Sequence, residues 1–311
     1  MDKIDNKILL ELVKNSRTSY STLAKMCRVS REVVTYRINN LKQEGIIHDF
    51  FTEIDIRKLG FVSALFFVRI KASYEKEFIE YIKNTNFVSW AGTHFGLWSL
   101  GMAIYGKDNE EIEKRFQKIY SQFKDAITDH QFEFYKTTKF FYEKYFNSKA
   151  ERQDKKFGNH KIDSSDRLIL MRLSKNSRLT SIELAKELNI TAPAVIKRIK
   201  NLEKEGYILK YSIFVNLSKL NKYQFVFFIK NKNLEDRSKL YLYLESHPKV
   251  SFLLDYLGDP FIEFGIFVDN PYEARAIAQE IEETFPENRI VDFFLVQEDF
   301  ISTGVPVCVF E

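Results

Sequence analysis

The chain contains the same segment twice, at a constant offset of 161 residues. The matching pairs are Asn15-Ser16-Arg17 with Asn176-Ser177-Arg178, Leu23-Ala24-Lys25 with Leu184-Ala185-Lys186, Arg37-Ile38 with Arg198-Ile199, and Glu44-Gly45 with Glu205-Gly206. The match weakens further along, where Phe66-Phe67-Val68 aligns with Phe227-Phe228-Ile229 and Gly96 aligns with Gly258 after a slip of one residue. Self-similarity over this length indicates two units built to one plan.

A polar stretch separates the two copies. Residues 147–160 are rich in lysine and arginine and contain Phe157 as almost their only apolar side chain, which is typical of a solvated linker. The sequence therefore predicts an α+β protein of two tandem units. We expect a winged helix-turn-helix at 1–60, a ferredoxin-like effector domain at 61–146, a linker at 147–160, a second winged helix-turn-helix at 161–221 and a second ferredoxin-like domain at 222–311.

The opening part of each copy has the pattern of three short helices. In the first copy, apolar residues fall at helical spacing, Ser19 and Ser30 are suitable N-caps, and Gly45 is suited to ending the third helix. The expected inward-facing residues are Ile8, Leu9, Leu12, Val13, Leu23, Ala24, Val34, Ile38 and Leu41, with Val195, Ile199 and Leu202 in the second copy. Ile46 to Phe51 and Thr52 to Ile56 are expected to form a two-stranded hairpin, the wing.

A tight turn between the second and third helices is the arrangement of DNA-binding helix-turn-helix motifs. The third helix is expected to direct Arg31, Glu32, Thr35, Tyr36 and Asn39 outward, where the second copy has Ala192, Pro193, Ile196, Lys197 and Lys200. The candidate DNA-binding residues are Ser30, Arg31, Thr35, Tyr36, Arg37 and Asn39 in the first copy, and Thr191, Lys197, Arg198 and Lys200 in the second. Fewer hydrogen-bonding groups in the second set predict that the two copies bind DNA unequally.

The charge distribution favours double-stranded DNA as the partner. Residues 2–50 carry a net charge of +3 and residues 162–211 carry +4, whereas residues 212–311 carry −7. Positive charge concentrated on the helical parts suits contact with phosphates. The alternative is that each three-helix part is only a module for protein contacts.

The closing part of each copy has the order βαββαβ, which is ferredoxin-like. The expected elements are strands at 61–70, 88–96, 98–105 and 132–145 with helices at 77–83 and 110–127, and in the second copy strands at 224–229, 250–257, 261–268 and from 290 onward with helices near Leu240 and at 272–285. The sheets are rich in phenylalanine, and each is expected to pack its uncovered face against the sheet of the other copy. The pairing makes the chain an intrachain pseudo-dimer and still allows a homo-oligomer.

Other classes of protein receive little support. The two cysteines, Cys27 and Cys308, form neither a disulfide framework nor a metal cluster, so no metal and no cofactor is expected. The chain lacks an apolar stretch of membrane-spanning length, so no membrane partner is expected and the cytosol is the natural compartment.

Taken together, the repeated residues resemble those of the feast/famine (Lrp/AsnC) regulators. The resemblance is most specific at Asp2, Asp5, Ile8-Leu9, Asn15-Ser16-Arg17, Leu23-Ala24, Ser30, Val34, Arg37-Ile38, Leu41 and Glu44-Gly45-Ile46-Ile47, and Asp163, Asp166 and Ile169-Leu170 repeat it. It implies a DNA-binding transcription regulator whose winged helix precedes an effector domain. Members usually carry one such unit and dimerise, so a tandem chain departs from the pattern.

A second departure concerns the effector. Amino-acid-sensing members of the family typically have Gly, any residue, an aromatic residue and then Asp where the second and third strands meet. This chain has Gly96-Leu97-Trp98-Ser99 and Gly258-Asp259-Pro260-Phe261, so the aspartate at the fourth position is absent from both copies. Amino-acid sensing is therefore not expected, and a different small-molecule effector is left open. The candidate effector-binding residues are His94, Gly96, Trp98 and Gly258, although a lone histidine beside a strand more often has a structural role.

An enzyme is the alternative function. Sirohaem decarboxylases resemble these regulators and work as two non-identical copies. Such a site needs histidine and arginine side chains around a tetrapyrrole, for which this chain offers His94, His130 and Arg69. The basic helical parts favour the regulator.

Overall fold

The computed structural model describes residues 1–149, 161–231, 236–258 and 262–311, and it has an α+β fold. Most of the predicted linker, residues 150–160, lies outside the described residues, as do Asp259, Pro260 and Phe261 of the expected effector turn. The chain divides into two compact units that each draw on both copies. One unit contains residues 1–62, 151–216 and 303–311, and the other contains residues 63–150 and 217–302.

The first unit contains two three-helix groups. Their helices are α1 (Lys3–Lys14), α2 (Tyr20–Cys27) and α3 (Arg31–Gln43) in the first copy, and α6 (Ser164–Lys175), α7 (Ser181–Leu188) and α8 (Ala192–Lys204) in the second. Local sequence explains where these helices begin, because the predicted caps Ser19, Ser30 and Thr191 each accept a backbone N–H of the first turn. The predicted apolar faces of α1 and α3 are buried, which confirms those predictions.

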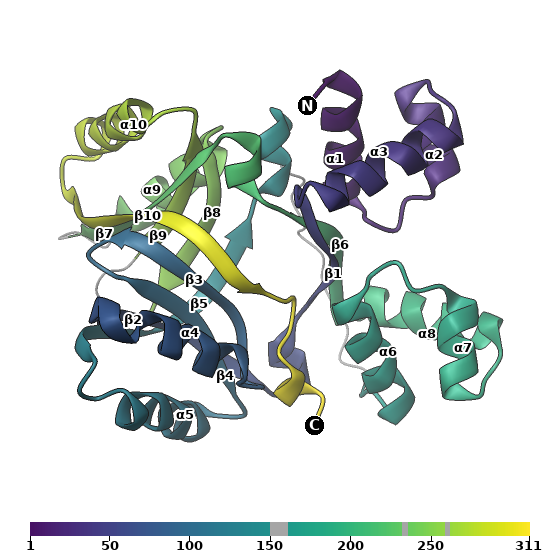
Figure 1. Ribbon diagram of the computed structural model, residues 1–311, viewed down its shortest axis with the longest axis horizontal. Helices are drawn as coiled ribbons and strands as arrows, with labels where there is room; N and C mark the ends of the chain where they lie inside the picture. The colour runs from purple at the N-terminus through teal and green to yellow at the C-terminus, as the bar shows by residue number, and fades with distance from the viewer. Residues whose placement is uncertain (150–160, 232–235, 259–261) are drawn as a thin grey trace. The chain divides into compact units, whose positions relative to one another are not determined.

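The predicted wing hairpin is wrong. Residues Ile47–Ile54 form one continuous strand, β1, which pairs antiparallel with β6 (Ile208–Val215) of the second copy. Figure 1 shows β1 and β6 running side by side next to the two helix groups. Residues 46–56 contain no glycine, asparagine or proline that would turn the chain back at Phe51-Thr52. The strand therefore continues, and its backbone N–H and C=O groups form hydrogen bonds with the strand of the other copy.

The second unit contains one closed sheet of eight strands among the described residues. The first copy supplies β2 (Val62–Ile70), β3 (Val88–Gly96), β4 (Leu100–Gly106) and β5 (Ile127–Phe140), and the second supplies β7 (Tyr223–Asn231), β8 (Val250–Tyr256), β9 (Ile262–Val268) and β10 (Asn288–Ser302). The strand order is β10-β3-β4-β2-β5-β8-β9-β7. The two sheets are therefore not separate stacked layers, because β5 pairs with β8 and β10 pairs with β3.

Helices cover the outside of this sheet, and aromatic side chains fill its inside. The covering helices are α4 (Glu75–Lys83), α5 (Asn109–Gln122), α9 (Arg237–Ser246) and α10 (Pro271–Thr284) (Figure 1). Phe66 packs outward against Phe116 of α5, with ring centroids 4.9 Å apart. Its neighbour Phe67 points inward, where its ring centroid lies 5.6 Å from that of Phe228 in the second copy. Alternate side chains of one strand thus contribute to two different cores.

Two predicted boundaries in the first copy are wrong. The helix expected at 110–127 ends at Gln122, and the strand expected at 132–145 runs from Ile127 to Phe140. Neither glycine nor proline marks the turn at residues 123–126. After the strand, Phe141 leaves the extended path, donates its N–H to the carbonyl of Ser251 and enters the apolar core of the second copy.

Candidate nucleic-acid interface

The outward side of α3 carries most of the hydrogen-bonding groups predicted for base contacts. Arg31 and Asn39 are exposed, and Tyr36 is 66% exposed. Thr35 is half-buried, and its hydroxyl donates to the carbonyl of Arg31 at 2.9 Å. The donor of Thr35 is therefore used within the helix, which leaves Arg31, Tyr36 and Asn39 as the side chains with donors directed to solvent.

The outward side of α8 has a different chemistry. Lys197 and Lys200 are exposed, whereas Ile196, 43% exposed, occupies the position equivalent to Thr35. Thr191 accepts the N–H of Ala194 at 3.3 Å, and Ser30 accepts the N–H of Val33 at the same distance. These two predicted DNA-binding hydroxyls therefore serve as helix caps.

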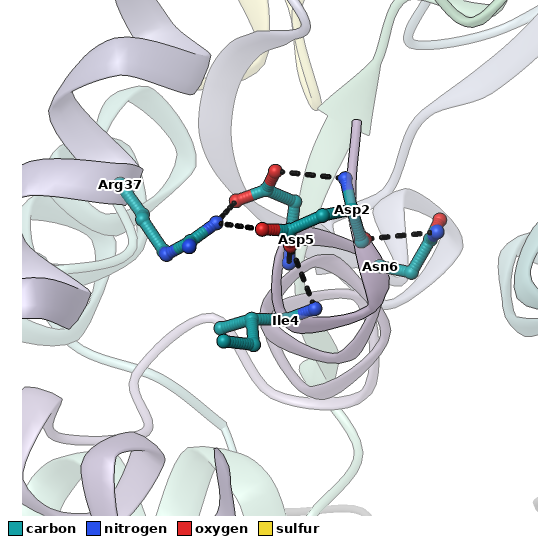
Figure 2. Close-up of polar contacts among 5 residues, drawn as sticks. All are labelled: Asp2, Ile4, Asp5, Asn6 and Arg37. Carbon is teal, nitrogen blue, oxygen red and sulfur yellow. Dashed lines mark hydrogen bonds and ion pairs between the residues drawn. The ribbon is translucent and has the colours of Figure 1, made fainter. Parts of the chain in front are cut away.

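Arg37, which the sequence predicts to bind DNA, makes an intramolecular contact in the structure. Its guanidinium lies across the N-terminus of α1 and donates to Asp2 at 2.7 Å and to Asp5 at 2.8 Å (Figure 2). The hydrogen bonds to Asp5 and Asp2 raise the pKa of Arg37. The pKa of Asp2 is lowered, first by the hydrogen bond from the N–H of Asp5 and to a smaller extent by the bond from the Arg37 guanidinium. Because the two carboxylates also cap α1, this group joins the first and third helices.

Arg198 repeats this arrangement in the second copy. It lies 2.8 Å from Asp163 and 2.8 Å from Asp166, and those carboxylates form the capping box of α6. Both arginines are thus held against their own helix group. Arg31, Tyr36, Asn39, Lys197 and Lys200 are the candidate residues left facing outward.

The repeated Asn-Ser-Arg segment has a role that its sequence pattern does not predict. The hydroxyls of Ser16 and Ser177 lie 2.6 Å apart, and both residues are fully buried. Arg17 donates to the carbonyls of Ser177 and Leu179, at 2.5 and 3.0 Å. Arg178 donates in return to the carbonyls of Ser16 and Thr18, at 2.5 and 3.2 Å. We call Ser16, Arg17, Ser177 and Arg178 the reciprocal clasp.

Strands β1 and β6 extend the reciprocal clasp into a continuous network. The N–H of Ser16 donates to the carbonyl of Tyr211 at 3.1 Å, and the N–H of Ser177 donates to the carbonyl of Phe50 at 2.9 Å. Behind them, Thr52 donates to the carbonyl of Leu173, and Ser212 donates to that of Val13. All of these bonds lie within one compact unit, so the two helix groups, and with them α3 and α8, hold a fixed relationship.

The predicted effector residues lie in the closed sheet and its turns. His94 is buried and stacks on Phe294 with ring centroids 3.9 Å apart, and Trp98 is buried near Phe67. Neither ring nitrogen of His94 nor the indole nitrogen of Trp98 has a hydrogen-bond partner among the described residues. Burial lowers the pKa of His94 to about 3, so this imidazole is neutral at physiological pH.

The two glycines of the effector set differ. Gly96 has a φ of +152°, and a Cβ there would lie 2.9 Å from the carbonyl oxygen of Phe293, so close strand approach requires glycine. Gly258 belongs to the other copy and has open space around it, with the Glu133 carboxylate 3.8 Å from an added Cβ. No described contact joins Gly258 to the other three predicted residues.

Comparison with known proteins supports the helix-turn-helix interpretation. A family model described as winged helix-turn-helix DNA-binding matches residues 1–48 and 162–208. An uncharacterized HTH-type transcriptional regulator of Pyrococcus horikoshii is 39% identical over 128 residues, which cover 40% of this chain and 86% of that protein. The HTH-type transcriptional regulator LrpA of the same organism is 48% identical over 59 residues, 19% of this chain and 42% of LrpA.

This chain belongs to the Lrp/AsnC family of transcriptional regulators. Within the family, its two helix-turn-helix segments and its two ferredoxin-like parts form a tandem arrangement. A solved structure of the siroheme decarboxylase NirDL is similar over 96% of this chain and 92% of that chain, with a TM-score of 0.62 and 14% identity. This likeness concerns the fold.

None of the helices in the described part of this Lrp/AsnC member has the length and apolar character to cross a membrane. The described residues also contain no group of three or more His, Cys, Asp or Glu side chains arranged to hold a metal ion.

Proposed function

We propose that this Lrp/AsnC member is a sequence-specific, double-stranded-DNA-binding transcription regulator that acts as a covalent pseudo-dimer. The observation that carries the proposal is the reciprocal clasp, which holds the two helix groups in one compact unit. In dimeric helix-turn-helix proteins, two recognition helices at fixed spacing match two half-sites about one helical turn, or a multiple of it, apart. Here one chain supplies both helices.

The two half-sites are proposed to contribute differently. Arg31, Tyr36 and Asn39 of α3 offer hydrogen bonds to base edges, and an arginine in this position suits the O6 and N7 acceptors of guanine. Lys197 and Lys200 of α8 offer charge to phosphates. The first copy thus supplies most of the hydrogen-bonded discrimination, and the second supplies affinity and register.

A small-molecule effector and a homo-oligomer are further parts of the proposed function. Buried polar nitrogens on His94 and Trp98 support a small-molecule effector inside the closed sheet. Assembly of several chains is compatible with the exposed apolar side chains of Phe95 and Phe293, which are 71% and 52% exposed.

The test is a binding titration of the full chain. A duplex is selected from a random pool, and its affinity is compared with that of a scrambled duplex at two salt concentrations. We expect tighter binding to the selected duplex and a steep loss of affinity with salt for both, because phosphate contacts release counterions. Absence of binding to every duplex at low salt contradicts the proposal.

A second candidate function is a siroheme-decarboxylase-like enzyme, favoured by the likeness of the whole chain to NirDL. A solved structure of NirDL in complex with an iron-uroporphyrin III analogue is also similar, with a TM-score of 0.63. Adding sirohaem to the purified chain tests this candidate. A saturable change in the visible absorbance supports it, and an unchanged spectrum argues against it.

A further inference from the structure

The outward side of α8 carries an apolar side chain where α3 carries polar ones. Ile196 is 43% exposed and lies one helical turn after Ala192, so both belong to the same stripe of the helix. The equivalent positions of α3 are Arg31 and Thr35. On the neighbouring helix α7, Ile182 is 61% exposed where the first copy has Ser21.

The charges around this stripe indicate what covers it. Lys197 follows Ile196 directly, and Lys200 lies one turn further along the stripe, and both are exposed. An apolar strip bordered by two cations fits a polyanion that offers an apolar group, rather than an apolar protein surface. The reciprocal clasp adds a second argument, because it fixes α8 relative to α3, the helix proposed to contact bases.

One base carries an apolar group at the edge that a recognition helix meets. Thymine has a methyl group on C5 in the major groove beside its O4 acceptor, and the other three bases present only hydrogen-bonding groups there without a methyl group. We propose that the second copy recognises thymine methyl groups through Ile196, with Ala192 as its neighbour. This inference rests on the proposed DNA binding and specifies the half-site contacted by α8: thymine at the position facing Ile196.

The two copies then use different chemistry on a single operator. In the first half-site, hydrogen bonds from Arg31, Tyr36 and Asn39 select bases. In the second, burial of a methyl group against Ile196 selects thymine while Lys197 and Lys200 contact phosphates. The discrimination is modest, because burying one methyl group changes affinity by about three- to fivefold.

Uracil substitution provides a direct test. Uracil retains every donor and acceptor of thymine and lacks only the methyl group. The two half-sites of the duplexes selected by the full chain are first assigned to the two copies. The Arg31→Ala variant makes this assignment, because it is expected to alter the consensus only of the half-site that faces α3. Thymines of the other half-site are then replaced by uracil, one at a time, and each affinity is measured.

We expect one or two of these replacements to weaken binding by about three- to fivefold in the wild-type chain. The Ile196→Ala variant should bind the thymine and uracil duplexes equally. Ile196→Val is the matched control, because it keeps a branched apolar side chain and should retain part of the difference. Since Ile196 is partly exposed, these variants are expected to fold, and an unchanged circular dichroism spectrum checks this.

Other outcomes of these measurements contradict the proposed recognition of thymine. A second half-site without enriched thymine, or uracil duplexes bound as tightly as thymine duplexes by the wild type, overturns the inference while the proposed DNA binding stands. An Ile196→Ala variant with unchanged affinity for all duplexes also overturns it. Absence of binding to any duplex removes the proposed function and this inference together.

Discussion

The side chains of Ser16 and Ser177 share a hydrogen bond of 2.6 Å across 161 residues of sequence. Each serine is the other's counterpart in the repeat, so the bond lies where the two copies meet. Both are fully buried, and the arginine that follows each one donates to backbone carbonyls of the opposite copy. The repeated Asn-Ser-Arg segment is therefore an interface motif as well as part of each helix group.

The serine pair should behave as one energetic unit. Ser177→Ala leaves the buried hydroxyl of Ser16 without its partner and should lower the free energy of unfolding by about 1–3 kcal/mol. Adding Ser16→Ala removes the orphaned group, so the double variant should lose less than the sum of the single variants. Urea unfolding of the three variants measures this coupling, and strictly additive losses would contradict it.

Arg178 should contribute more to the affinity for a duplex with two half-sites than to the affinity for a duplex with one half-site. Its guanidinium holds two carbonyls of the first copy and lies 4.6 Å from the centre of the Tyr20 ring. Arg178→Ala should therefore weaken binding to a duplex with two half-sites, while the smaller affinity for a single half-site changes little. The exposed residue Lys175 provides the control, since Lys175→Ala removes a nearby positive charge without touching the reciprocal clasp. Equal losses for both variants on both duplexes would attribute the effect to charge alone.

Arg31 and Lys197 should separate specificity from affinity. Arg31→Ala should relax sequence preference by about 1–3 kcal/mol if the side chain makes a bidentate contact with guanine. Lys197→Ala should weaken binding to all duplexes alike and reduce the salt dependence, because a phosphate contact is lost. Affinities for selected and scrambled duplexes at two salt concentrations measure both effects. Loss of discrimination in Lys197→Ala with Arg31→Ala unaffected would reverse the assignment of the copies.

Arg37→Ala should change stability rather than base preference. The substitution removes the two ion pairs with Asp2 and Asp5 that join α1 to α3. Thermal unfolding should therefore begin at a lower temperature, while the selected duplex is still preferred over the scrambled one at a temperature where the variant is folded. A stable variant that no longer discriminates between the duplexes would instead support Arg37 as a DNA-contacting residue.

Glu263 should make stability depend on pH. This carboxyl group is fully buried, accepts a hydrogen bond from Tyr256, and burial raises its pKa to about 8. The unfolded chain releases this proton near pH 4.3. The folded state therefore holds a proton that the unfolded state has lost, so the stabilising contribution is complete below about pH 4 and declines as the pH rises towards 8.

Glu263→Gln should flatten this decline, because the amide does not titrate. Urea unfolding at pH 5 and pH 8.5 compares the variant with the wild type and with Glu283→Gln, which changes an exposed carboxylate on α10. If the variant and the wild type lose the same stability between the two pH values, Glu263 is not the source of the dependence.

The sequence alone determined the features that depend on neighbouring residues. The caps Ser30 and Thr191 and the buried faces of α3 and α8 follow from interactions within a few residues, so their pattern predicted them. The constant offset between the copies likewise established the tandem plan. The outward side of α3 could also be predicted, because the residues of the helix that do not belong to its buried face must face outward.

Tertiary structure decided the features that depend on distant partners. The residues near Phe51 do not indicate whether this segment folds back into a hairpin or forms one strand, β1, that pairs with β6. The local pattern of a strand does not determine which other strand it pairs with. Arg37 looks equally suited to phosphate and to carboxylate, and only the folded chain brings Asp2 and Asp5 to it. The same holds for Ser16 and Ser177: their repetition was visible in the sequence, but a hydrogen bond needs its two atoms within about 3 Å, which only folding provides.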